Sequence, residues 1–140
     1  MQTRIGVLPL LLALIVPMAQ AADEVEPPKV HKQGGSTYVT GGSGEAQRKA
    51  LFKISNKFPI QLIFEVEGQE GDISGVKVTL TDQSGNVLIE GVSEGPYFYM
   101  NPPAGGRFTM DAEYQGEKLS MTKDLVGRRY LVLEFKFHAK

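Results

Sequence analysis

The strongest constraint in this sequence is a period-two alternation of apolar and polar residues that begins after Pro59. Such alternation is typical of half-buried strands, with apolar side chains facing a core and polar ones facing water. The apolar members of the clearest runs are Leu62, Phe64 and Val66; Val76, Val78 and Leu80; Phe108, Met110, Ala112 and Tyr114; and Leu131, Leu133, Phe135 and Phe137. Weaker runs fit strands at 86–92, 97–100 and 119–123. The pattern predicts a mainly β fold, a seven-stranded antiparallel β-sandwich over residues 59–138.

One amphipathic helix is predicted ahead of the sandwich, over residues 45–58. Its apolar positions recur at helical spacing, at Ala46, Ala50, Leu51, Ile54 and Phe58. A basic stripe lies on the opposite side, at Arg48, Lys49, Lys53 and Lys57. Asn56 and Pro59 mark the end of the helix. The basic stripe is interpreted as a solvated helix face, with contact to an anionic partner as the alternative.

The first 21 residues have the layout of a secretory signal peptide. Arg4 supplies a positive charge, an apolar run follows, and Ala19-Gln20-Ala21 offers small residues before a cut at Ala22. The run is shorter than the roughly 20 residues of a membrane span, so no stable membrane insertion is expected, and an uncleaved N-terminal anchor is the alternative. Residues 22–44 contain three Pro-Pro or Gly-Gly pairs and are predicted to be a flexible lead-in.

Composition excludes several classes of function. The chain has 140 residues, a net charge of -1 and no cysteine. A near-neutral charge argues against a nucleic-acid partner. The absence of cysteine excludes disulfides, thiol catalysis and Cys-ligated metals, and no other metal or cofactor is predicted. A secretion signal without cysteine favours the bacterial periplasm over an animal extracellular setting.

Several turn motifs occur in a suggestive order. Residues 75–85 form a strand that enters a D-x-x-G turn, and residues 94–99, 102–109 and 114–116 supply the later turns. In this order and spacing they resemble the carboxypeptidase regulatory-like domains, which are transthyretin-like (prealbumin-like) seven-stranded sandwiches. With the Gly-Gly-x-Gly-Glu start within residues 40–45, the chain is similar to small secreted proteobacterial proteins of unassigned activity.

The resemblance covers about Thr40 to Phe137 and departs at the Pro-Pro turn. Asn101 stands where the family pattern has leucine, and Ala104 and Gly105 are inserted before the glycine that would match Gly-x-Tyr. Domains of this type are mostly accessory modules, so the resemblance implies binding or assembly and not catalysis.

Neither histidine is placed as a catalytic residue would be. His31 falls in the predicted lead-in and His138 follows the last predicted strand, and a catalytic histidine needs a rigid orienting partner. No catalytic residue is therefore predicted. A hydrolase or metal enzyme is the alternative if His138 meets acidic residues such as Glu134 in a pocket.

Two loops resemble ligand-binding motifs only superficially. Residues 41–44 precede a helix like a phosphate cradle, but no Gly-Lys-Ser/Thr follows and Glu45 would repel a phosphate. Residues 82–86 resemble the start of a calcium loop, but Val87 and Ser93 occupy the positions that need Gly and Glu. Helix capping and a hairpin turn, respectively, are the preferred interpretations.

The aromatic run of residues 97–99 is the strongest binding candidate. Tyr97 and Tyr99 share one face of a strand, and Phe98 and Met100 share the other. If Phe98 and Met100 fill the core, both tyrosines and Asn101 are available for carbohydrate or protein recognition. The opposite phase, in which the tyrosines are buried, remains open.

Three functions follow from these observations. The first is a non-catalytic periplasmic binding module whose partner is an envelope protein or a polysaccharide. The second is a structural or assembly protein of the envelope in which an exposed strand edge, predicted at residues 118–123, pairs with another chain. The third is the enzyme described above.

Overall fold

The computed structural model describes residues 26–127 and 129–139, together with Gly6. One α-helix, one 3-10 turn and nine strands form in this part of the chain. Their bounds are β1 (His31–Gln33), β2 (Ser36–Gly41), α1 (Glu45–Lys53), η2 (Ser55–Lys57), β3 (Ile60–Val66), β4 (Lys77–Asp82), β5 (Val87–Val92), β6 (Tyr97–Asn101), β7 (Gly106–Tyr114), β8 (Glu117–Leu125) and β9 (Leu131–Phe137).

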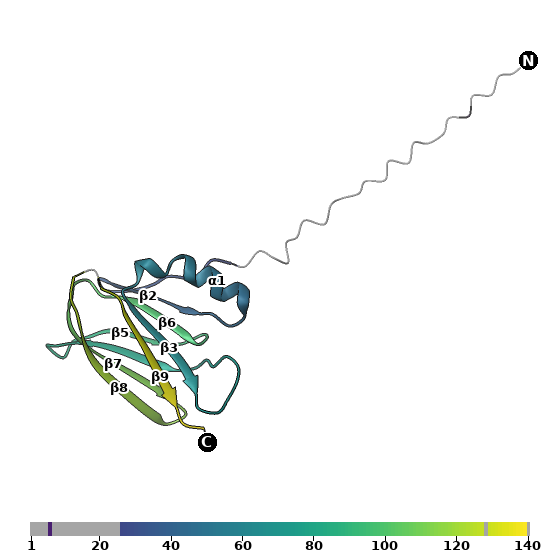
Figure 1. Ribbon diagram of the computed structural model, residues 1–140. Helices are drawn as coiled ribbons and strands as arrows, with labels where there is room; N and C mark the ends of the chain where they lie inside the picture. The colour runs from purple at the N-terminus through teal and green to yellow at the C-terminus, as the bar shows by residue number, and fades with distance from the viewer. Residues whose placement is uncertain (1–5, 7–25, 128, 140) are drawn as a thin grey trace, which may run out of the picture.

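The strands form two sheets, and α1 lies over the five-stranded one (Figure 1). The strand order is β1-β2-β6-β3-β9 in this sheet and β5-β4-β7-β8 in the other. Both sheets contribute to one hydrophobic core, because the alternation predicted from the sequence directs their apolar faces toward each other. Its fully buried members include Leu62, Phe98, Met100, Phe135, Leu80, Ile89 and Met110. The mainly β, two-sheet prediction is confirmed.

The strand count differs from the prediction of seven because β1 and β2 lie inside residues 22–44, the predicted flexible lead-in. β2 pairs with β6 from Thr37 to Gly41. Its side chains explain why this part of the lead-in is ordered: Val39 is fully buried under α1, and the ring of Tyr38 stacks on Phe98 at 4.9 Å. Burial of these two side chains offsets the entropy of ordering a glycine-rich segment.

The prediction of a purely antiparallel sandwich is wrong at one pair of strands. β3 and β9 run parallel, with Ile60 opposite Leu131 and Val66 opposite Phe137. Parallel neighbours need a long connection, and here that connection is most of the remaining strands. A pairing this distant in sequence leaves no local signal, which is why turn motifs did not reveal it.

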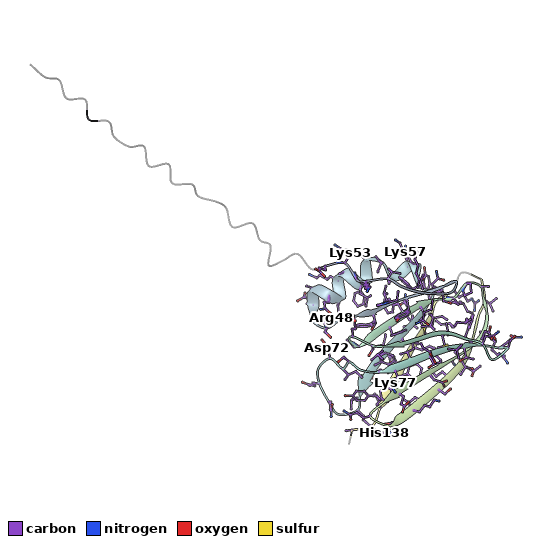
Figure 2. All side chains as sticks on the ribbon, turned by 180° about the vertical axis from the view of Figure 1, so that it is seen from behind. Arg48, Lys53, Lys57, Asp72, Lys77 and His138 are labelled. Atoms are coloured by element: carbon purple, nitrogen blue, oxygen red, sulfur yellow. The ribbon has the colours of Figure 1, made fainter. Side chains whose placement is uncertain are left out.

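The helix is shorter than the predicted 45–58. α1 ends at Lys53, and Ser55–Lys57 form the 3-10 turn η2. At the other end, Asp72 accepts a hydrogen bond from the backbone N–H of Gly44 at 3.0 Å and pairs with Arg48 at 3.5 Å (Figure 2). The loop between β3 and β4 thereby supplies the negative charge that a helix N-terminus favours.

The two edge strands of the four-stranded sheet, β5 and β8, differ in the hydrogen bonds that they make. At β5, the Gln33 side chain donates to the carbonyl oxygen of Glu90 at 2.6 Å and accepts from its backbone N–H at 2.9 Å. At the opposite margin lies β8, which contains the predicted edge at residues 118–123. The strand is nine residues long and pairs with β7 on one side.

Candidate functional site

The phase of β6 places Phe98 and Met100 in the core between the sheets, so Tyr97, Tyr99 and Asn101 point to the outer face. That face is covered in part by α1. Tyr99 is only 3% exposed and packs with Val39, Leu51 and Phe58. Burial, with a smaller contribution from Tyr97, raises the pKa of the Tyr99 phenol to about 12. Tyr99 is thus a packing residue beneath the helix.

Tyr97 and Asn101 are placed differently from Tyr99. Tyr97 is half-buried, and its ring meets the ring of Phe52 edge-on at a centroid distance of 5.5 Å. Asn101, at the far end of the strand, is exposed and lines a pocket. Of the three predicted binding residues, Asn101 lines a pocket described for residues 26–127 and 129–139, and it lies at the opposite end of β6 from Tyr97.

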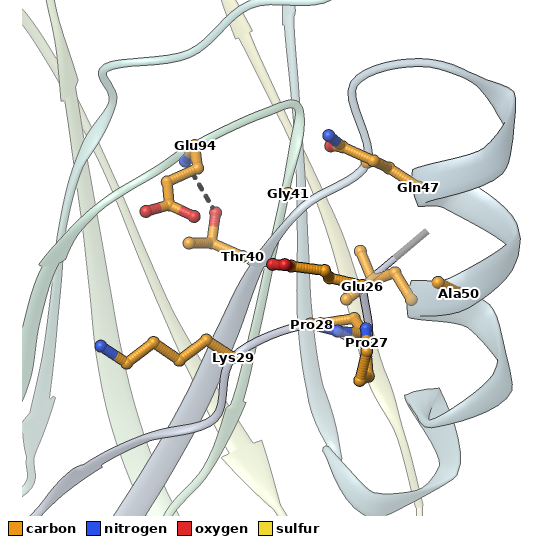
Figure 3. A pocket seen from close by; sticks show the side chains of 11 residues that line it. Glu26, Pro27, Pro28, Lys29, Thr40, Gly41, Gln47, Ala50 and Glu94 are labelled. Carbon is orange, nitrogen blue, oxygen red and sulfur yellow. Dashed lines mark hydrogen bonds between the residues drawn. The ribbon is translucent and has the colours of Figure 1, made fainter. Parts of the chain in front are cut away.

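The pockets on this face belong to one groove that runs along α1 beside β2, which we call the α1–β2 groove. The segment 26–30 crosses it, and Pro27 and Pro28 line a pocket on each side. The first pocket, of about 340 Å³, lies between the start of α1 and the end of β2 (Figure 3). Its wall is braced by Thr40, whose hydroxyl donates to the carbonyl oxygen of Tyr97 and accepts from the backbone N–H of Glu94.

The second pocket, of about 310 Å³, lies under the end of α1. Its walls are mainly apolar, formed by Pro27, Pro28, Val30, Ile54 and Phe58. Three polar side chains join them: Thr37, Asn101 and Lys57. Thr37 and Asn101 are directly opposite each other in the β2–β6 ladder. Concave, largely apolar sites of this size with a few polar groups are typical of ligand sites.

The polar groups of the second pocket are uncommitted within the part of the chain that the structure describes. There, the side chains of Thr37, Asn101 and Lys57 make no hydrogen bond or ion pair. The turn that carries Lys57 is fixed, because Gln61 donates to the carbonyl oxygens of Ser55 and Phe58 at 3.0 and 3.1 Å. The Tyr130 hydroxyl donates to the Asn56 carbonyl at 2.9 Å. The Lys57 side chain is therefore attached to a turn whose backbone these hydrogen bonds hold in place.

Sequence reasoning identified Asn101 but missed Thr37 and Lys57 as its neighbours. Lys57 belongs to the basic stripe interpreted as a solvated helix face. The remaining lysine and arginine side chains of that stripe do not line this pocket. Figure 2 shows Lys53, at the end of α1, and Lys57, in η2, at one end of the molecule and His138 at the other. No sequence signal relates residue 37 to residue 57, since only the folded sheet and helix bring them together.

The two motif-like loops have structural roles. The N–H of Gly44, at the N-terminus of α1, is bound by the Asp72 carboxylate and so is not offered to a phosphate. In the 82–86 turn, Asp82 accepts from the backbone N–H groups of Ser84 and Asn86 at 3.0 and 2.9 Å. These bonds, chiefly the one from Asn86, lower the pKa of Asp82, and they describe an Asx-type turn.

Neither histidine lines the groove's second pocket. His31 stacks on Tyr38 at 4.6 Å. His138 lies 2.8 Å from a Glu117 carboxylate oxygen and 4.0 Å from one of Glu67, and its side chain is 74% exposed. Glu134, the acidic residue expected beside His138, is therefore not one of these neighbours. Within residues 26–127 and 129–139, no cluster of three or more His, Cys, Asp or Glu side chains is arranged to hold a metal ion.

The His138–Glu117 pair predicts a pH-dependent contact between β9 and β8. The hydrogen bond to Glu117, assisted by its charge, raises the pKa of His138 above 6.5. The pair therefore stabilises the fold below about pH 6.5, and this contribution is lost as the pH rises through the folded-state pKa. In an NMR titration, Glu117→Gln should lower the His138 pKa toward 6.5, and Glu67→Gln should lower it less. An unchanged His138 pKa in Glu117→Gln would contradict this assignment.

Comparison with known proteins leaves the family open. No family model matches the chain, and no curated protein matches it. Among solved structures, the Bacillus anthracis TIE protein is similar over 58% of this chain, with a TM-score of 0.39 and 13% sequence identity. The chain spans about 15% of the length of that structure. No helix in the described residues is long and apolar enough to cross a membrane.

Proposed function

We propose that this chain is a non-catalytic binding module of the bacterial periplasm and that its ligand binds in the α1–β2 groove. One observation carries the proposal. The second pocket of the groove combines apolar walls with three uncommitted polar side chains, Thr37, Asn101 and Lys57. Secretion is supported by the signal-like residues 1–21, which apart from Gly6 lie outside the described residues. The absence of cysteine favours the periplasm over an animal extracellular setting.

The pocket's chemistry suits an acidic polysaccharide. The Lys57 ammonium attracts a carboxylate, while the Asn101 amide and the Thr37 hydroxyl each donate to or accept from sugar hydroxyls. The apolar faces of sugar rings pack against Pro28 and Val30. An acidic segment of an envelope protein is the competing ligand, since it offers the carboxylate without the array of hydroxyls.

A titration of the labelled chain with soluble oligo-uronates tests this proposal. We expect amide chemical-shift changes at residues that line the second pocket, and at least about threefold weaker binding in Lys57→Gln and in Asn101→Ala. Lys53→Gln is the matched control, because this lysine, the last residue of α1, is close to Lys57 in the chain but does not line the pocket. Shift changes confined to other surfaces, or equal weakening by Lys53→Gln, would contradict the proposed site.

If oligo-uronates do not bind, a pull-down from periplasmic extract decides between the two ligand classes. A protein recovered with the native chain and Lys53→Gln, but not with Lys57→Gln, would replace the polysaccharide as ligand. The same recovery with all three chains would contradict the role of the groove.

We also propose that β3–β9 are the seven strands of a transthyretin-like sandwich of the carboxypeptidase regulatory-like type. All seven lie within residues 59–138 and divide into groups of three and four between the two sheets. In this proposal β1, β2 and α1 are additions that extend one sheet and build the groove.

A second candidate function is assembly of an envelope structure by pairing of strand edges. It is favoured by β8, whose length and position at a sheet margin make it a template for another strand.

A further inference from the structure

The backbone of β8 presents a regular open edge. The β7–β8 hairpin turns through Gln115 and Gly116, with φ angles of 50° and 86°. A two-residue turn of this kind makes Tyr114 and Glu117 a hydrogen-bonded pair. Since hydrogen-bonded and non-hydrogen-bonded pairs alternate along a ladder, the backbone groups of every second residue of β8 point away from β7. These outward-facing residues are Lys118, Ser120, Thr122 and Asp124.

The outward backbone groups of β8 differ in their hydrogen bonding from those of β5, the strand at the other edge of the same sheet. The Gln33 amide occupies the outward N–H and C=O of Glu90 on β5. Across the described ranges, no side chain or loop forms a comparable bond to the outward backbone groups of β8. The outward backbone groups of the nine-residue strand β8 are therefore available to pair with another strand, whereas those of Glu90 on β5 are not.

The outer face of β8 is complementary to itself when the strand is reversed. We propose that β8 pairs antiparallel with β8 of a second copy, with Met121 opposite Met121 on the two-fold axis. This register places Lys118 opposite Asp124 and Ser120 opposite Thr122 on the outer face. All four outward-facing residues of each copy then find hydrogen-bonded partners. Registers centred on Ser120 or Thr122 leave one of the two end residues beyond the end of the other strand.

Charge and burial favour this register further. Lys118 is exposed and makes no ion pair with any residue that the structure describes. Asp124 is held by Arg107 through two contacts, at 2.9 and 3.3 Å, and its carboxylate has lone pairs left for the partner's lysine. Opposite charges on directly opposed residues stabilise a strand pair. On the inner face, Leu119 and Met121 are partly buried apolar side chains that an added strand shields from water.

This inference rests on the second candidate function, edge pairing, and specifies its partner as the chain itself. It is independent of the α1–β2 groove, which lies on the other sheet.

Single cysteine substitutions test the register, because the natural chain has no cysteine to interfere. Opposed residues of a non-hydrogen-bonded pair have Cα atoms about 4.5 Å apart, which lies within disulfide reach. In the full chain under mild oxidation, Met121→Cys should give several-fold more disulfide-linked dimer than Ser120→Cys or Thr122→Cys. A preference for Cys at position 120 or 122 would overturn the register. Equal, trace cross-linking at all three positions would overturn self-pairing.

A backbone substitution tests the edge without any cross-link. Ser120→Pro removes an outward N–H but none of the bonds to β7, and proline is tolerated at an outward position of an edge strand. Because the two-fold axis repeats the loss, we expect the dissociation constant of the dimer to rise at least about tenfold in sedimentation equilibrium. Ser120→Ala, the control, should dimerise like the native chain. Native-like dimerisation of Ser120→Pro would overturn the proposal.

A photo-cross-linker at position 120 in cells separates failure of self-pairing from failure of edge pairing. A product of two copies supports the proposal. A product with a different chain would overturn self-pairing and retain edge pairing as the function. If position 120 cross-links to no other chain, self-pairing and the edge-pairing function both fail.

Discussion

Replacing Phe98 with alanine is expected to lower the free energy of unfolding by about 3–5 kcal/mol. Phe98 is 0% exposed and belongs to the core between the two sheets. The ring of Phe98 stacks on Tyr38, and Tyr38 in turn stacks on His31. Removing the Phe98 ring therefore leaves a cavity beneath the β1–β2 hairpin. Urea unfolding followed by circular dichroism measures the loss.

Phe52→Ala is the matched control for this substitution. It removes the same side chain from a site that is 48% exposed, where its ring contact is with Tyr97. A loss of about 1 kcal/mol or less is expected. A loss of about 1 kcal/mol or less for Phe98→Ala as well would contradict its expected contribution to the inter-sheet core.

Gly95→Ala is expected to cost about 3 kcal/mol, at the upper end of the range for overpacking. A Cβ atom at Gly95 would lie 2.4 Å from the carbonyl oxygen of Gly41 and 2.5 Å from its carbonyl carbon. Both are backbone atoms of β2, which cannot rotate away as a flexible side chain can. The turn before β6 must therefore separate from β2, and the hydrogen bond from Glu94 to Thr40 weakens. Thermal unfolding of the variant measures the effect.

The neighbouring Glu94→Ala serves as its control. The Glu94 side chain is exposed, and its contact with Thr40 is made through the backbone N–H, which alanine retains. Its stability should stay within about 0.5 kcal/mol of the native value. Native-like stability of Gly95→Ala would show that β2 and the turn can move apart at little cost.

Strands with clear alternation were predictable because their side chains face one shared core. Phe64, Met110 and Phe135 are all buried there, as their spacing indicates. β2 was harder to predict because glycine pairs flank it on both sides. Its signal was the short run of β-branched and aromatic residues from 37 to 40, which has strong strand propensity.

The candidate site was predictable only in part. Period-two alternation put Tyr97, Tyr99 and Asn101 on one face, and the structure confirms that they share it. The alternation could not say what lies above that face, since the position of α1 depends on packing against Val39 and Tyr99. Tertiary packing therefore decided which of the three residues is accessible.

The position of β2 has a consequence for the order in which the chain becomes structured. β2 lies inside the five-stranded sheet, yet its partner β6 is 57 residues further along at the Thr40–Tyr97 contact. Synthesis proceeds from the N-terminus, so β2 emerges from the ribosome long before β6. Until residue 101 has emerged, α1 has no Tyr99 to cover and the groove has no Asn101 wall. The groove therefore forms late in folding, after most of the chain has been synthesised.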